Sequence, residues 1–235
     1  MMKENPMRAT KGQTVVEYAL LVGLVVLVLI LILSMTGNVI RGAFCSVVNS
    51  LSPKSALGCS AYFSEDFNDM SDWRTVYGNA NWALEDGNLV MTGGDQRMIN
   101  TTPLPDDYKI ILDSAQIKAG PGYGILFRQS QNGSSYSGYS FQVDPGLGNK
   151  FAFRRYDRNG AELGTPLAVS APHGSFDWHA PHKVEVVVKG STYSAYIDGN
   201  LVLTATDTTY KSGQVGLRTW TGTQAVFGHM TVTAP

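Results

Sequence analysis

The sequence predicts a mainly β protein in which a hydrophobic N-terminal α-helix precedes an antiparallel two-sheet sandwich. Short alternating runs fill residues 61–235, separated by turn dipeptides such as Asp86-Gly87, Asn132-Gly133, Asn159-Gly160 and Asp198-Gly199. These dipeptides are the strongest local signal for hairpins, because their turns require positive φ. No long helical pattern interrupts the runs, which favours a sandwich or jelly roll over an α/β fold.

The composition is typical of a secreted β-rich protein. Charged residues make up 16% of the chain, against an average of about 25%. Glycine accounts for 25 of the 235 residues, which is above its average share of about 7%. The net charge of -1 provides no electrostatic footprint for nucleic acid, so we expect no nucleic-acid partner. Two cysteines are too few for a disulfide-built scaffold or a four-cysteine zinc site.

An apolar run near the N-terminus predicts a membrane segment. Tyr18 to Ile40 carries no charge, and a helix rising about 1.5 Å per residue would span about 35 Å there, enough for a bilayer core of about 30 Å. The leader before it is basic, with Lys3, Arg8 and Lys11, so it should stay cytoplasmic. We therefore expect contact with membrane lipid, a single-pass topology and an extracellular C-terminal domain.

The junction Gly12-Gln13-Thr14-Val15-Val16-Glu17-Tyr18 resembles the prepilin signature of the Flp, or tight-adherence, branch of type IV filaments. The resemblance implies a leader over 1–12, cleavage after Gly12 by a prepilin peptidase and a methylated Gln13. It also implies a membrane or filament helix over 13–41, in which Glu17, followed by Tyr18, pairs with the terminal amine of another pilin subunit during assembly. The alternative is that Glu17 snorkels to the lipid headgroups.

Residues 42–60 read as a linker that contains both cysteines. Cys45 and Cys59 would lie outside the cell, where a disulfide is the expected state. Closing a loop of about 15 residues would contribute about 3 kcal/mol. The alternative is two free buried thiols.

Within the domain at 61–235 we expect about a dozen strands. They are predicted at 61–67, 81–85, 88–92, 108–118, 122–129, 138–144, 150–157, 183–190, 192–198, 200–206, 214–220 and 225–233.

Three stretches carry a family resemblance: Phe63–Leu89, Gly122–Asp144 and Val184–Arg218. They resemble the concanavalin A-like and laminin-G-like jelly rolls, in particular the 3-keto-disaccharide hydrolase-like domains. The likeness implies fold far more than activity. Calcium is common in laminin-G-like domains near the first strand, where Glu65 and Asp66 could serve. We otherwise expect no cofactor and no metal site.

A catalytic carboxylate pair is not recognisable in the sequence. The acidic pairs such as Glu85-Asp86 are adjacent, so they point to opposite faces of a strand or lie in turns. His173, His179 and His182 fall in a loop marked by prolines, without further ligands. The sequence therefore predicts a protein that is not an enzyme.

The strand phases predict a binding face. One phase is apolar and contains Ile125, Phe127, Phe141, Val143, Phe151, Phe153, Val215 and Leu217. The opposite phase contains Arg128, Gln142, Asp144, Arg154, Tyr156, Arg218 and Trp220. An aromatic ring beside planar hydrogen-bonding groups is typical of sugar-binding sheets. The alternative is an ordinary solvated face with cross-strand pairs such as Arg154 opposite Asp144.

Together these features suggest a pilin-like subunit of a surface filament that displays a jelly-roll head for adhesion or glycan binding. The alternative is a glycan-binding or disaccharide-hydrolase-like domain anchored by a single membrane span.

Overall fold

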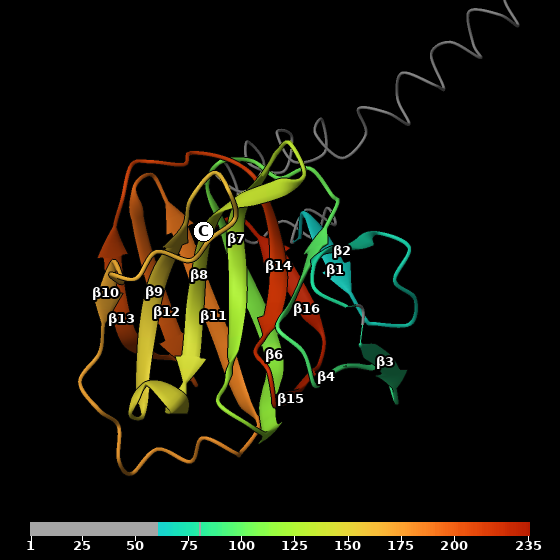
Figure 1. Ribbon diagram of the computed structural model, residues 1–235, viewed down its shortest axis with the longest axis vertical. Coiled ribbons are helices and arrows are strands. Elements are labelled where there is room, and N and C mark those ends of the chain that lie inside the picture. The colour runs from blue at the N-terminus through green and yellow to red at the C-terminus, as the bar shows by residue number, and fades with distance from the viewer. Residues whose placement is uncertain (1–60, 80) are drawn as a thin grey trace, which may run out of the picture.

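The computed structural model describes residues 61–79 and 81–235 (Figure 1). The expected leader, membrane helix and Cys45–Cys59 pair lie outside the described residues. Among the residues that are described, no helix is long and apolar enough to cross a membrane.

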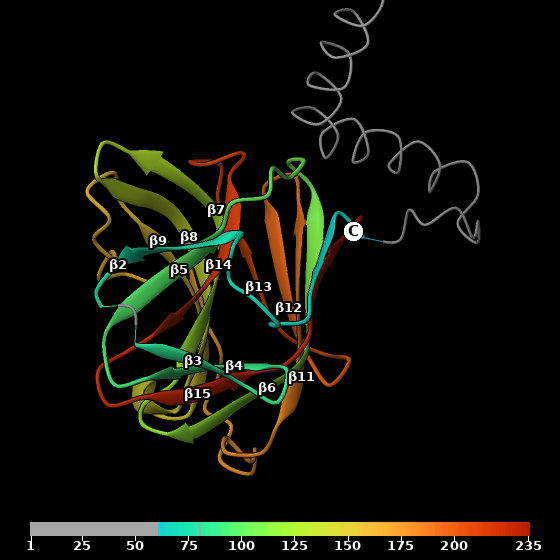
Figure 2. The same ribbon diagram turned by 90° about the vertical axis from the view of Figure 1, so that its right-hand side faces the viewer.

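All strand pairs are antiparallel, and two sheets stack face to face (Figure 2). The nine-stranded sheet follows the order β13 (Asn200–Thr206), β12 (Thr192–Ile197), β11 (His182–Lys189), β6 (Tyr108–Ala119), β15 (Gln224–Phe227), β4 (Asn88–Thr92) and β3 (Trp82–Glu85). Beside this path, β16 (Met230–Thr233) pairs with β6 and with β1 (Phe63–Glu65). The seven-stranded sheet follows β10 (Ala168–Val169), β9 (Lys150–Tyr156), β8 (Ser135–Asp144), β7 (Tyr123–Asn132), β14 (Gln214–Thr219), β5 (Gln96–Asn100) and β2 (Trp73–Tyr77). The predicted two-sheet sandwich is confirmed.

The predicted strands are present, with one division and three additions. The run at 225–233 forms two strands, because the chain leaves β15 after Phe227 and resumes in β16 at Met230. Strands β2, β5 and β10 were not expected. Every residue of β5 is buried, and a strand covered on both faces shows no alternation of apolar and polar residues.

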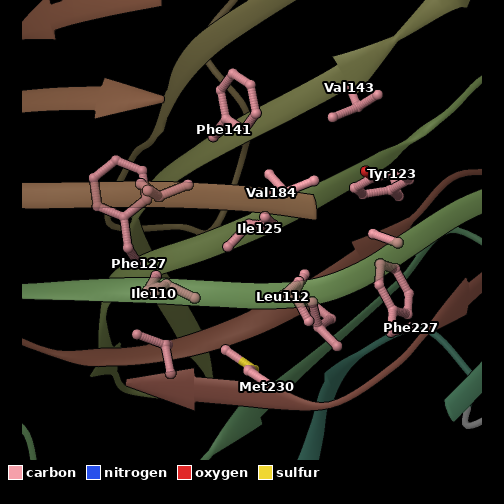
Figure 3. Close-up of a cluster of buried hydrophobic side chains, with 14 of the residues drawn as sticks. Ile110, Leu112, Tyr123, Ile125, Phe127, Phe141, Val143, Val184, Phe227 and Met230 are labelled. Atoms are coloured by element: carbon pink, nitrogen blue, oxygen red, sulfur yellow. The ribbon is translucent and has the colours of Figure 1, made fainter. Parts of the chain in front are cut away.

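The core lies between the two sheets (Figure 3). Ile125, Phe127 and Phe141 from the seven-stranded sheet face Ile110 and Val184 from the nine-stranded sheet, and all five side chains are fully buried. The apolar phase predicted from the sequence is therefore the inner face of its sheet. Aromatic rings fill much of this layer.

A β-bulge interrupts the pairing of β7 with both neighbours at Arg128. Arg128 has a φ of 50°, which is rare for a residue other than glycine, and its N–H donates to the Tyr108 hydroxyl at 3.0 Å. Each of the two segments beside the bulge has a glycine at the point of closest approach. A Cβ at Gly138 would lie 2.6 Å from the Arg128 carbonyl oxygen, and one at Gly213 would lie 2.5 Å from the Arg128 carbonyl carbon.

Candidate functional site

A polar cluster lies on the outer face of the seven-stranded sheet. Strand β8 provides Gln142, β9 provides Arg154 and Tyr156, and β14 provides Arg218. The loop after β9 brings Glu162 to the same place through an isolated bridge with Tyr156. We call these five residues the Glu162 cluster.

The Glu162 carboxylate accepts hydrogen bonds from three of the other members and forms an ion pair with the fourth, Arg154. One oxygen, Oε2, accepts from Gln142 Nε2 at 2.9 Å, from the Tyr156 hydroxyl at 3.1 Å and from Arg218 Nη1. The other, Oε1, lies 3.1 Å from Arg154 Nε. The carboxylate thus links its own loop to strands β8, β9 and β14. It holds these elements together on the outer face of the sheet.

The cluster is sealed from solvent to a degree that the sequence did not predict. Gln142 is 0% exposed, Tyr156 1% and Arg218 7%. These three residues form an interior hydrogen-bonded network, not the open polar surface that alternation suggested, because the loop carrying Glu162 lies over them. The cross-strand pair of the alternative, Arg154 opposite Asp144, is not formed: the register places Arg154 opposite Ser140 and Asp144 opposite Lys150.

Two further residues join the polar network beside Arg218. Asp95 accepts from Arg218 Nε at 3.2 Å. The guanidinium of Arg97 lies between two aromatic rings, 4.4 Å from the Tyr77 centroid and 4.9 Å from the Tyr156 centroid. Burial holds the pKa of Arg97 below its ordinary value, and cation–π contacts offset part of that cost.

Beyond Arg218 the cluster opens into a hollow of about 220 Å³, which we call the Trp220 hollow. It is lined by Pro121, Asp144, Gly146, Leu147 and Trp220. The Arg218 guanidinium lies 5.1 Å from the centre of the Trp220 ring. Asp144 Oδ1 accepts from the Leu147 N–H at 2.9 Å, and burial raises the pKa of the Asp144 carboxyl above its ordinary value.

Six of the seven predicted face residues therefore gather in one region, and Arg128 does not. Its bulge directs the side chain away from the outer face toward the end of the sandwich, where it is 2% exposed. Gly138 and Gly213 were the sequence signal for this departure, since glycine within or beside a strand often marks a bulge.

Glu162, Asp95 and Arg97 were missed by the sequence reasoning. Glu162 follows the Asn159-Gly160 turn in a segment without strand periodicity, so nothing local indicates which surface it meets. Arg97 belongs to β5, whose pattern does not alternate.

The calcium candidates near the first strand have other contacts. Glu65 accepts from the Phe67 N–H at 2.8 Å and from the Trp73 indole N–H at 2.7 Å. Asp66 lies 2.5 Å from His229 Nδ1. Within 61–79 and 81–235, no group of three or more His, Cys, Asp or Glu side chains is placed to hold a metal ion. Calcium binding at Glu65 and Asp66 stays a prediction.

Solved structures support the fold. A carbohydrate-binding module, CBM66, from Bacillus subtilis is 24% identical with a TM-score of 0.59, over 71% of this chain and 98% of that chain. A Bacillus subtilis protein of unknown function with a galectin-like fold is 14% identical with a TM-score of 0.58, over 74% and 96%. A β-glucanase from Bacillus licheniformis is 16% identical with a TM-score of 0.54, over 74% and 98%.

No curated protein sequence matches the chain. The sequence model of the 3-keto-alpha-glucoside-1,2-lyase-like domain matches residues 63–233, which is nearly the whole described sandwich. The described strands β1 to β16 fall within that match. The chain belongs to the family of 3-keto-alpha-glucoside-1,2-lyase-like domains.

Proposed function

We propose that the domain at 61–235 binds a glycan and that the Trp220 hollow receives one of its sugar rings. The observation that carries the proposal is the hollow itself, where a half-buried tryptophan and the Asp144 carboxyl meet over a fixed polar cluster. A flat aromatic ring packs against the apolar face of a sugar, and a carboxylate accepts from its hydroxyls.

The Glu162 cluster supports this function by holding the hollow rigid. Arg218 contacts both Glu162 and the Trp220 ring, so the guanidinium beside the tryptophan is held in place before a ligand arrives. A site that needs no ordering on binding keeps more of its interaction free energy. The likeness to a carbohydrate-binding module adds support at the level of the fold.

A glycan array with the full chain in a detergent that carries no sugar tests the proposal. Trp220→Ala should lower the signal of at least one bound glycan at least tenfold, about 1.4 kcal/mol. Tyr196→Ala is the matched control, because Tyr196 lies on β12 of the other sheet and should leave the signals unchanged. Equal signals from wild type and Trp220→Ala for every glycan that binds would contradict the proposal.

A second candidate is chemistry on the bound sugar. Asp144 has a raised pKa, due first to burial, and the nearby negative charge of Glu162 raises it further. A carboxyl group with a raised pKa is a candidate for the proton transfer that general acid and base catalysis uses. Cleavage of a 3-keto-glucoside by wild type but not by Asp144→Asn would support this candidate, and no product from wild type would remove it.

We also propose that the N-terminal segment displays the domain on the cell surface as part of a pilus. The Gly12 and Glu17-Tyr18 signature and the apolar run carry this proposal. Mass spectrometry of sheared surface material should find a methylated N-terminus at Gln13. An uncut N-terminus found only in membranes would instead favour a domain with a single membrane anchor.

A further inference from the structure

A second cavity of about 330 Å³ lies at one end of the sandwich; we call it the rim cavity. Its walls come from the segment before β6, the turn between β11 and β12, and the segment after β13. It is lined by Asp106, Asp107, Arg128, Gly190, Ser191, Asp207, Thr208, Tyr210 and Lys211. Its size falls within the range of about 300–1,000 Å³ that small-ligand sites occupy.

Arg128 lines the rim cavity because of the bulge in β7. Bulges beside functional sites redirect a side chain, and residues held at unusual φ are concentrated at such sites. Here the bulge at Arg128 directs the side chain into the rim, although strict alternation would place it with the Glu162 cluster.

The guanidinium of Arg128 ties the three walls together. Nη2 donates to the Asp106 carbonyl at 3.0 Å and to the Gly190 carbonyl at 2.7 Å. Nη1 donates to the Tyr210 carbonyl and to the Tyr193 hydroxyl, both at 3.1 Å. Nε is buried and has no hydrogen-bond partner in the described structure. The cavity is therefore preorganised around a buried cation that retains one unused donor.

Two of the three aspartates that line the rim cavity already accept hydrogen bonds from other residues of the domain. Asp107 Oδ1 accepts from the Gly190 N–H at 2.8 Å. Asp207 accepts from the Tyr139 hydroxyl at 2.7 Å and from Arg155 Nη1 at 2.8 Å.

Four side chains remain available to a ligand in the rim cavity. Asp106, Ser191, Thr208 and Lys211 make no side-chain hydrogen bond to any other residue of 61–79 or 81–235. They offer one carboxylate acceptor, one ammonium donor and two hydroxyls that can do both. Tyr210 adds an aromatic surface to the lining.

The charge of the rim cavity favours a neutral ligand. The carboxylates of Asp106, Asp107 and Asp207 are balanced by Arg128 and Lys211 in the lining and by Arg155, which pairs with Asp207. A mixture of donors and acceptors without net charge suits a ring of hydroxyls, each of which donates and accepts.

We propose that the rim cavity binds a single neutral sugar ring, independently of the Trp220 hollow. The two sites lie at opposite ends of β14, since Lys211 precedes the strand and Trp220 follows it. A six-residue strand rising about 3.3 Å per residue separates them by about 20 Å, too far for one ring to fill both. Two sites on one domain would give a multivalent glycan avidity without further contacts.

Saturation-transfer difference NMR of the full chain in micelles of lauryldimethylamine oxide, a detergent without a sugar headgroup, tests the proposal. The probes are D-fructose, N-acetylglucosamine and the methyl glycosides of glucose, galactose and mannose. The double variant Asp106→Asn/Lys211→Gln alters the rim cavity at two exposed positions, and Trp220→Ala alters the other site. Circular dichroism checks that both remain folded.

The proposal expects at least one sugar whose signal persists in Trp220→Ala and falls at least fivefold in the double variant. Thr208→Trp, which fills the cavity from an exposed position, should remove the same signal. If no sugar gives a signal in Trp220→Ala, the rim cavity does not bind sugar, although the Trp220 hollow can still do so. Signals that persist in both rim variants would also overturn it.

Discussion

Replacing Glu162 with Gln should destabilise the domain by about 2–4 kcal/mol. The side chain keeps its size, but one of the two carboxylate oxygens becomes an NH₂ group. If the remaining oxygen takes the place of Oε2, it still accepts from Gln142, Tyr156 and Arg218. The new NH₂ group then faces Arg154 Nε, 3.1 Å away in the native structure, so a donor meets a donor.

The magnitude follows from the bonds that change. Losing the ion pair between Arg154 Nε and Glu162 Oε1, and placing an NH₂ donor beside the guanidinium, costs about 1.5–3 kcal/mol. Arg218 also loses a charged partner, although Asp95 Oδ1 remains 3.2 Å from its Nε. The Glu162 side chain is 24% exposed, so water screens part of the charge effect and the total should stay below the cost of breaking a fully buried ion pair, about 3–5 kcal/mol.

Urea unfolding of residues 61–235, followed by tryptophan fluorescence, measures the effect. Glu185→Gln is the matched control, because Glu185 is about as buried as Glu162 but has a single charged partner, the half-exposed Lys183 at 3.3 Å, and a pair with an exposed partner contributes only about 0–1 kcal/mol. A loss below about 0.5 kcal/mol for Glu162→Gln, or an equal loss for the control, would refute the view that this carboxylate holds the outer face together.

Three further predictions concern individual residues. Asp144→Asn should raise stability at pH 7 but not at pH 3, because the folded pKa of Asp144 is raised and the cost of ionising it appears as pH rises; denaturation at both pH values measures this. Burial alone would raise the pKa of Asp207, but hydrogen bonds from Thr209 and Tyr139 hold it below its ordinary value. Its stabilisation is thus present above about pH 4 and lost as pH falls through the folded pKa, so Asp207→Asn should flatten acid unfolding and cost about 1.5–3 kcal/mol at pH 7. Gly216→Ala should cost about 3 kcal/mol or more in thermal unfolding, since the new Cβ would lie 2.1 Å from the Met98 carbonyl oxygen; an unchanged Tm would contradict it.

Local patterns in the sequence predict most of the strands. The run at 88–92 matches β4, and the run at 200–206 matches β13, because alternation and the Asp-Gly turns beside them depend only on near neighbours. β5 escapes this reasoning: both of its faces are covered, so its residue pattern carries no period.

The candidate site likewise contains residues that local patterns predict and one that they do not. Alternation brings Gln142, Arg154, Tyr156 and Arg218 to one face, and the structure gathers them there. It does not indicate Glu162, which lies 56 residues from Arg218 in sequence and reaches it from a loop.

By itself, the sequence determined which faces of the strands are apolar, where the chain turns and how the N-terminal segment differs from the rest. Those properties are local, since side-chain period and turn conformation depend on adjacent residues. Only the tertiary structure decided that a loop seals the polar face around Glu162 and that a bulge sends Arg128 to the rim. Both outcomes depend on contacts between segments far apart in the chain, for which no local pattern exists.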